Sequence, residues 1–191
     1  MKTKFALFVG MMLGFYLLPF QLVAQTKYKV GSDVELKLTG TSSLHDWEML
    51  SNQATGEGVL ILQDGDLVKV ESLTVQMPAE SLKSGKGAMD RNAYSAIDTK
   101  KYKQVQFVLN SFTNTGANKW KAGGNFTIAG VRKAASFDVT SSKSGNNFKF
   151  EGKYTFNLTD YSIDPPTALL GTVKTGDEVT IHFNIGLQPA Q

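Results

Sequence analysis

Apolar and polar residues alternate along most of this chain, and this period of two is the feature that most constrains its fold. Between Asp33 and Thr39, the apolar Val34, Leu36 and Leu38 alternate with polar, mostly charged residues. The same alternation recurs in later segments, at residues 59–62, 68–70, 73–77, 105–109, 126–128, 137–139, 148–158 and 179–185. Because successive side chains of a strand point to opposite faces, each segment predicts a strand with one buried and one solvated face.

Short turn sequences separate these segments, at Asp64-Gly65-Asp66, Asn114–Asn118, Ala129-Gly130 and Ser144–Asn147. Glycine and asparagine at such positions favour hairpin connections. About eight strands, joined mostly by short hairpins, predict an all-β fold. From the residues alone, the antiparallel sheet either closes on itself as a barrel or forms a sandwich.

One insertion interrupts the alternation, from Pro78 to Lys101. Residues Ala79–Ser84 can form one helical turn, and a weak apolar face then follows at helical spacing, at Met89, Ala93, Ala96 and Ile97. We expect a short helix here, at the open end of a barrel. Two roles stay open for it, a lid over a ligand or a plug that only fills the barrel end.

Residues 1–24 have the pattern of a secretory signal peptide. Lys2 and Lys4 precede an unbroken apolar run from Phe5 to Leu18, and Ala24 is the small residue before the predicted cut. An uncleaved membrane anchor is the alternative, but the run is shorter than the roughly 20 residues of a membrane-spanning helix, which favours cleavage. Cleavage predicts one domain, residues 25–191, that is periplasmic or secreted and does not span a membrane.

The composition excludes several classes of protein. The chain contains no cysteine, which rules out disulfide bonds, cysteine-ligated zinc and thiol catalysis. Without the first 24 residues, 18 basic and 17 acidic residues remain. A balance so close to neutral gives no support to nucleic-acid binding, which needs a clustered basic face.

A serine-nucleophile site would have to use Ser42 or Ser43 with His45 and Asp46. Neighbouring residues of one strand point to opposite faces, so these side chains cannot form the required chain of hydrogen bonds unaided. The sequence also lacks the Gly-x-Ser-x-Gly elbow of hydrolases. We therefore expect no catalysis.

A metal site would need both histidines, His45 and His182, together with a carboxylate such as Asp160 or Glu178. Two histidines without a short ligand spacing are a weak signal for metal binding. In addition, His182 alternates with the inward-facing residues of its strand and should point outward. We therefore expect no metal and no cofactor.

These observations together favour a carrier of a small apolar-chain ligand, a monomer or a weak homodimer. Closed sheets of about eight strands can hold one such ligand in their interior. A different class is the alternative: a barrel filled by its own side chains that serves as a protein-interaction or stress-response module, without a lipid ligand. The 12 phenylalanines suit a filled interior as well as a lined one. An enzyme acting on a lipid is a third possibility.

Several motifs, in the right order and spacing, resemble those of the YceI-like family, also described as lipid- or polyisoprenoid-binding-like. They are Thr39–Trp47, Asp98–Phe107, Gly124–Val131, Leu158–Ile163 and Gly176–Val179. The resemblance implies an extended, lipocalin-like antiparallel β-barrel with an amphiphile or isoprenoid chain in its interior. It also implies export to the periplasm.

Candidate ligand contacts include aromatic and polar residues next to the predicted strands. The ring of Trp47 can stack on an apolar chain while its N–H meets a polar head group. His45, with Asp46, can hydrogen-bond such a head group. Tyr102 and Phe107 begin a strand and can line the pocket. Core packing or a structural hydrogen bond is the alternative for each.

Other candidates lie in the insertion and in one apolar loop. Met89, Tyr94 and Ile97 can cap the cavity. Leu169 follows a proline pair in an unusually apolar connection and can close the barrel mouth, or simply plug it. Arg91 can attract an anionic head group but is better interpreted as a solvated surface charge.

Overall fold

The computed structural model describes residues 23–168 and 170–190. Within them lie ten β-strands: β1 (Val23–Ser42), β2 (Trp47–Ser51), β3 (Thr55–Gln63), β4 (Asp66–Pro78), β5 (Gln104–Gly116), β6 (Lys119–Ile128), β7 (Val131–Ser144), β8 (Asn147–Asn157), β9 (Thr167–Ala168) and β10 (Val173–Pro189). The helical elements are α1 (Gly87–Ile97) and two short 3-10 helices, η1 (Ala79–Ser81) and η2 (Leu158–Tyr161). The predicted signal peptide overlaps the described residues only at Val23 and Ala24, which pair with Gln63 and Leu62 of β3.

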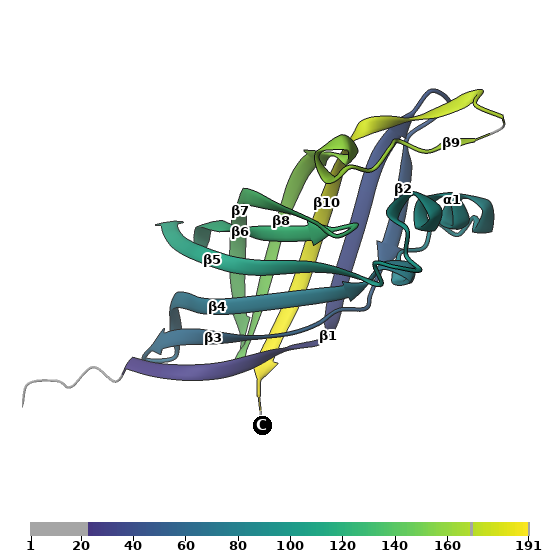
Figure 1. Ribbon diagram of the computed structural model, residues 1–191. Coiled ribbons are helices and arrows are strands. Elements are labelled where there is room, and N and C mark those ends of the chain that lie inside the picture. The colour runs from purple at the N-terminus through teal and green to yellow at the C-terminus, as the bar shows by residue number, and fades with distance from the viewer. Residues whose placement is uncertain (1–22, 169, 191) are drawn as a thin grey trace, which may run out of the picture.

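Eight of these strands form a closed antiparallel β-barrel, which confirms the predicted fold class (Figure 1). Their order around the barrel is β1, β3, β4, β5, β6, β7, β8 and β10, and β1 pairs with β10 to close it. Tight turns connect the strands of the hairpins at the glycine-containing sequences that predicted them. Gly65 and Gly130 adopt φ of 85° and 77° there, a region that glycine enters without strain.

The strand boundaries differ from the sequence prediction where bulges shift the phase of the alternation. Residues 68–70 and 73–77 belong to one strand, β4, because the register with β3 slips between the pairs Leu60–Val70 and Val59–Ser72. The pairing of β1 with β10 has a similar irregularity between Val30 and Val34, and the sequence analysis predicted no strand in the part of β1 before it. A bulge inserts an extra residue and so breaks the period of two on which the prediction rests.

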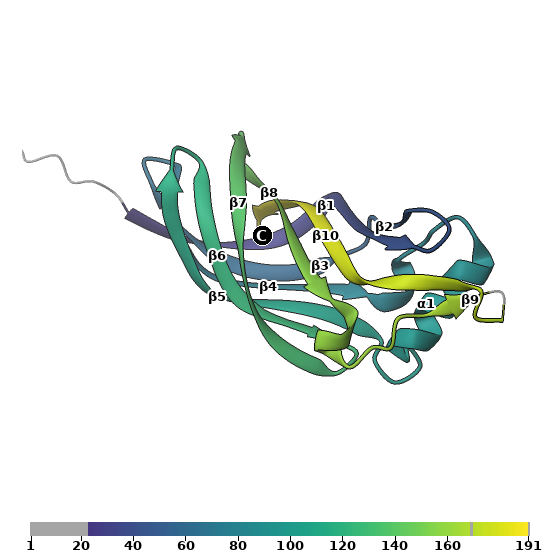
Figure 2. The ribbon, with the colours of Figure 1, turned by 90° about the horizontal axis from the view of Figure 1, so that it is seen from above.

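Strands β1 and β10 are long and continue past the barrel, as Figures 1 and 2 show. There β2 pairs with β1 and β9 pairs with β10. Helix α1 lies at this same end in both views. The predicted helix of the insertion is therefore confirmed, whereas β2 and β9 had no clear signal in the sequence.

The hydrophobic core consists of two adjoining clusters. The larger cluster fills the barrel and contains residues from β1 and β3 to β8 and β10, such as Leu60, Phe107 and Phe137. The smaller cluster lies where β1, β2 and β4 meet the insertion, and consists of Val34, Leu36, Met49, Met77 and Leu82. Helix α1 contacts both clusters, with Met89 and Ala93 against the smaller one and Ala96 and Ile97 against the larger one.

Candidate functional site

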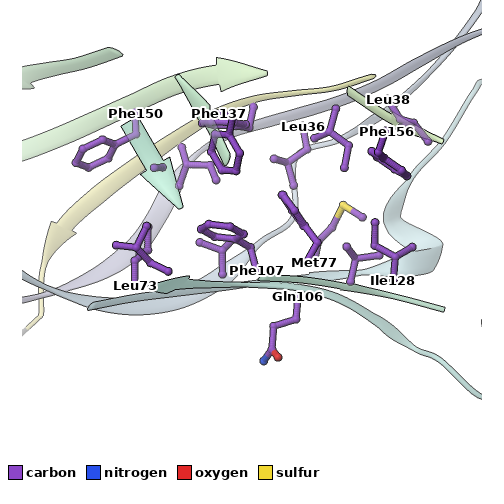
Figure 3. Close-up of a pocket in the computed structure, with 18 of the residues that line it drawn as sticks. Leu36, Leu38, Leu73, Met77, Gln106, Phe107, Ile128, Phe137, Phe150 and Phe156 are labelled. Atoms are coloured by element: carbon purple, nitrogen blue, oxygen red, sulfur yellow. The ribbon is translucent and has the colours of Figure 1, made fainter. Parts of the chain in front are cut away.

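The barrel encloses a cavity of about 150 Å³ (Figure 3). Seven of the eight barrel strands contribute side chains to its wall, and only β3 does not. In β10 the lining residues follow the period of two that the sequence shows, as Ile181, Phe183, Ile185 and Leu187. In β5, Val105, Phe107 and Leu109 do the same, and Phe112 joins them after a register shift. Inward-facing residues of seven barrel strands therefore build most of the site.

The wall of the cavity is almost entirely apolar. Only two of its residues, Lys37 and Gln106, have polar side chains. Lys37 Nζ lies 3.9 Å from Glu48 Oε2, and the side chain is 36% exposed. Figure 3 shows the amide of Gln106 directed away from the lining side chains. An apolar chain in this cavity would gain dispersion contacts with the wall, whereas a charged group would find no partner of opposite charge.

Aromatic rings pack closely around this space. The ring of Phe107 lies 4.8 Å from that of Phe126 and 5.4 Å from that of Phe137, measured between centroids. Phe137 in turn meets Phe183 edge-on at 5.4 Å. Tilted and edge-on contacts of this kind are the favourable ones for aromatic pairs. The rings hold one another in place and set the shape of the cavity wall.

A buried tyrosine stands behind one part of the wall. Tyr161 of η2 is 0% exposed, and its ring packs edge-on against Phe156 at 5.0 Å. Its hydroxyl has no hydrogen-bond partner within 3.5 Å among the described residues. Burial raises the pKa of this phenol well above its usual value. The sequence analysis did not single out Tyr161, which lies between the lining residues Leu158 and Ile163.

The insertion covers one end of the cavity, the end at which β1 and β10 continue past the barrel. Ile97, the last residue of α1, is part of the cavity lining. The hydroxyl of Tyr94 lies 2.6 Å from the carbonyl oxygen of Leu82 and 2.9 Å from that of Glu80, so it ties α1 to the segment that precedes it. Met89 packs against the smaller core cluster.

Of the predicted ligand contacts, the structure places Phe107 and Ile97 in the cavity wall. Met89, Tyr94 and Tyr102 lie outside it. Tyr102 packs against the turn glycine Gly130, where an added Cβ would clash with its ring. Leu169 lies outside the described residues, so its predicted role has no structural counterpart here.

Trp47 and His45 also lie away from the cavity. The indole Nε1 of Trp47 donates a hydrogen bond to the carbonyl oxygen of Thr41 at 2.8 Å, and its ring lies directly over Gly40. The Nδ1 of His45 lies 2.7 Å from the carbonyl oxygen of Asp46, within an exposed turn. Both residues thus make the local structural contacts that were the alternative to ligand binding.

The hydrogen bonds around Ser42 do not connect a nucleophile to a base. Its hydroxyl donates to the carbonyl oxygen of His45 at 2.7 Å and accepts the backbone N–H of Leu44 and of His45. The other histidine, His182, has its Nε2 3.3 Å from Thr39 Oγ1. Within residues 23–168 and 170–190, no group of three or more metal-ligating side chains comes together.

Most of the cavity-lining residues were missed as site residues, although their positions were visible in the sequence as the inward half of each strand. Leu36, Leu38, Leu73 and Phe137, labelled in Figure 3, all belong to segments predicted to alternate. The signal was therefore present, but alternation marks a buried face without saying whether that face packs tightly or surrounds a cavity.

Fold and site together define a class of protein: a small, closed antiparallel β-barrel with an apolar internal cavity. Within that class, the chain belongs to the YceI-like domain family, which matches residues 32–187. The family resemblance seen in the sequence motifs is therefore confirmed. Among the described residues, we find no helix with the length and apolar character needed to cross a membrane.

Relatives with sequence similarity include UPF0312 proteins of Pseudomonas putida. Those of strains W619 and GB-1 are each 28% identical over 113 residues, a match that covers 55% of this chain. The chain spans 59% of the length of these curated relatives.

Solved structures show the same fold at lower identity. BcnA of Burkholderia cenocepacia has a TM-score of 0.68 at 19% identity and covers 80% of this chain and 95% of its own. A polyisoprenoid binding domain from Saccharophagus degradans, implicated in plant cell wall breakdown, has a TM-score of 0.65 at 9% identity and covers 85% and 98%. The YceI protein of Campylobacter jejuni has a TM-score of 0.53 at 17% identity and covers 64% and 74%.

Proposed function

We propose that this protein is an exported carrier that binds the apolar chain of an amphiphilic or isoprenoid lipid inside its barrel and catalyses no reaction. The observation that carries this proposal is the cavity wall, which is apolar on all sides and built by seven strands of one closed sheet. The Saccharophagus degradans domain described as polyisoprenoid binding has the same fold and supports the isoprenoid class. The signal-peptide pattern of residues 1–24 supports export to the periplasm or beyond.

The size of the cavity indicates how a chain would bind. At about 150 Å³, it is comparable to an engineered cavity in another protein that admits benzene. Such a space accommodates the end of an apolar chain, and we place the rest of a longer chain past Ile97, beneath α1. Each buried methylene contributes roughly 0.8 kcal/mol, so about ten of them supply the order of free energy that micromolar binding requires.

The cavity also indicates where the polar head group would lie. A phosphate or carboxylate inside the barrel would lose its hydration without gaining a charge partner. Because Lys37 and Gln106 direct their polar ends away from the cavity, we place the head group outside, next to the insertion. The ligand class is therefore an amphiphile whose chain is inside and whose head is in water.

One observation favours the second candidate, a filled barrel that acts as a protein-interaction or stress-response module. Phe126, Tyr154 and Phe156 stack on one another at centroid distances of 5.1 and 5.4 Å, and Tyr161 packs edge-on against Phe156 at 5.0 Å. Rings packed in this way occupy space that a long chain would need. A carrier must therefore use the remaining cavity or displace part of the stack.

Native mass spectrometry of the exported protein distinguishes the two candidates. We expect a reproducible added mass that solvent extraction releases as a single amphiphile. A clean apoprotein mass, with no uptake of added isoprenoids or fatty acids, would instead favour the filled-barrel module.

A pair of matched variants locates the binding site. Leu73→Trp adds a large side chain to the cavity wall, whereas Thr74→Trp adds the same side chain to the opposite face of β4. We expect Leu73→Trp to weaken uptake of the extracted amphiphile at least tenfold and Thr74→Trp to leave it unchanged. Equal uptake by two well-folded variants would place the ligand outside the barrel.

A further inference from the structure

The positive charge of this protein is concentrated in the insertion. Residues 79–103 contain six basic and three acidic residues, whereas residues 23–78 and 104–190 together contain 12 basic and 14 acidic residues. The six basic residues are all exposed: Lys83, Lys86, Arg91, Lys100, Lys101 and Lys103. The barrel is thus slightly negative, and the insertion forms a basic surface at one end of it.

None of the six cations is neutralised by a carboxylate of the described residues, although Lys83 and Lys101 lie over the rings of Tyr94 and Tyr102, at 4.9 and 5.0 Å from the ring centroids. Across residues 23–168 and 170–190, none of them lies within 4.0 Å of a carboxylate oxygen. Two acids of the insertion are occupied instead: Asp90 accepts hydrogen bonds from the backbone and hydroxyl of Ser84, at 2.8 and 2.6 Å, and Glu80 accepts one from Thr99 at 2.8 Å. Asp98, the third acid, is exposed at the C-terminus of α1.

Exposed leucines surround this basic surface. Leu44, in the β1–β2 loop, is 67% exposed, Leu50 of β2 is 44% exposed, and Leu170, in the β9–β10 turn, is fully exposed. The backbone of Leu50 exchanges two hydrogen bonds of 2.8 Å with that of Lys83, which places a leucine beside a cation.

The two leucine-bearing loops are held together. The N–H of Ser43 donates to the carbonyl oxygen of Lys174 at 2.9 Å, and the N–H of Lys174 donates to Ser43 Oγ at 3.1 Å. Figures 1 and 2 both place α1, β2 and the β9–β10 turn at the same end of the molecule, away from the β3–β4 and β5–β6 hairpins. One end of the molecule therefore combines basic side chains that have no carboxylate partner in the described part of the chain with exposed apolar side chains. We call it the insertion end: residues 43–50, 79–103 and 170–174.

We infer that the insertion end docks on the surface of an anionic lipid bilayer. A polybasic surface is attracted to anionic head groups, and leucines at loop tips can enter the boundary between head groups and acyl chains. Outside the insertion, this end also holds the acids Asp46 and Glu48, and Glu48 is paired with Lys37. The seven basic residues of the insertion end still outnumber its five acids. The leucines lie on separate segments, Leu44 and Leu170 in two loops and Leu50 in β2, which suits a fluid lipid surface better than a shaped protein partner.

This docking surface goes beyond the proposed ligand binding and does not depend on it. If both hold, the end of the cavity that Ile97 lines faces the bilayer. The two properties are measured separately, because vesicle binding needs the insertion end and ligand uptake needs the barrel interior.

Vesicle sedimentation with the exported protein tests the inference. We expect binding to vesicles of phosphatidylcholine with about one third phosphatidylglycerol, little binding to phosphatidylcholine alone, and a decrease as salt is added. Lys86→Glu with Arg91→Glu should weaken binding at least tenfold, because each basic residue near an anionic surface contributes a factor of about five. Leu44→Ser with Leu170→Asn should weaken it several-fold, and asparagine tolerates the left-handed φ of 55° at position 170.

Matched controls lie at the opposite end of the barrel. Lys119→Glu and Val68→Ser change an exposed cation and a 47% exposed apolar residue there, and both should bind vesicles like the unchanged protein. Unchanged thermal melting of each variant shows that it is folded. Equal loss of binding in the controls, or no binding to either kind of vesicle, overturns the inference and points to a protein partner for this end. Vesicle binding without ligand uptake supports this inference and contradicts the proposed carrier function.

Discussion

At the scale of single residues, Gly124 determines how closely two strands of the barrel approach. A Cβ at this position would lie 2.5 Å from both the Cζ of Phe107 and the carbonyl oxygen of Val108 on the neighbouring strand. Real Cβ atoms do not approach other atoms so closely, so the missing side chain is what allows the ring of Phe107 to approach the backbone of β6.

Gly124→Ala should therefore lower the free energy of unfolding by about 1–3 kcal/mol, the usual effect of overpacking an interior. Gly116→Ala is the matched control, because a Cβ there would meet only the Lys119 side chain, at 3.9 Å. Urea unfolding of the two variants measures the difference. A Gly124→Ala protein as stable as the Gly116→Ala protein would mean that the strands separate at no energetic cost.

At the scale of elements, one carboxylate joins η2 to the last barrel strand. Asp177 of β10 accepts two hydrogen bonds from Thr159, from its N–H at 2.9 Å and its hydroxyl at 2.7 Å. These hydrogen bonds lower the pKa of Asp177 below its usual value. Because η2 carries Tyr161 and is followed by Ile163, this contact supports one part of the cavity wall.

The stabilisation from Asp177 should depend on pH in a defined direction. A carboxyl whose pKa is lowered in the folded state stabilises the protein above its unfolded pKa, and this contribution is lost as the pH falls through the folded pKa. We therefore expect Asp177→Asn to lower the Tm at pH 7 and to differ less from the unchanged protein below about pH 4. Glu178→Gln, one residue away, is the control. Its Tm difference from the unchanged protein should not become smaller as the pH falls. A Tm difference that stays constant from pH 7 to pH 3 would contradict the assignment.

At the scale of the whole molecule, ligand binding and folding are linked. The cavity exists only when all barrel strands are paired, so a ligand that binds it stabilises the folded state alone. An isoprenoid or fatty acid present at 100 times its Kd should add about 2.7 kcal/mol, which raises the Tm by roughly 5–10 °C for a domain of this size. Thermal melts followed by circular dichroism test this. Leu73→Trp should show a much smaller shift, and an unchanged Tm with every apolar ligand tried would argue for the filled barrel.

The outcome for the predicted site residues shows where sequence reasoning reaches its limit. Both Phe107 and Ile97 line the cavity. Phe107 belongs to the apolar face of an alternating strand, and Ile97 to the apolar face of the short helix, so the sequence pattern already predicted that each is directed inward. Trp47 was singled out for its chemistry. In the structure its indole N–H donates a hydrogen bond to the carbonyl oxygen of Thr41 and its ring packs against Gly40, and its contact with a ligand stays a prediction. A side chain's ability to bind a ligand says nothing about whether a closer partner already occupies it.

The alternation of apolar residues by itself determined that this chain forms an antiparallel all-β fold, and a helical spacing indicated the short helix. The motifs indicated the family and, with it, that the sheet closes as a barrel. Only the tertiary structure decided which apolar residues surround a cavity, where bulges shift the register, and which end carries the free cations. The reason is physical: a period of two specifies which face of a strand is buried. Whether buried faces meet or leave space depends on the distances between strands that are far apart in the sequence.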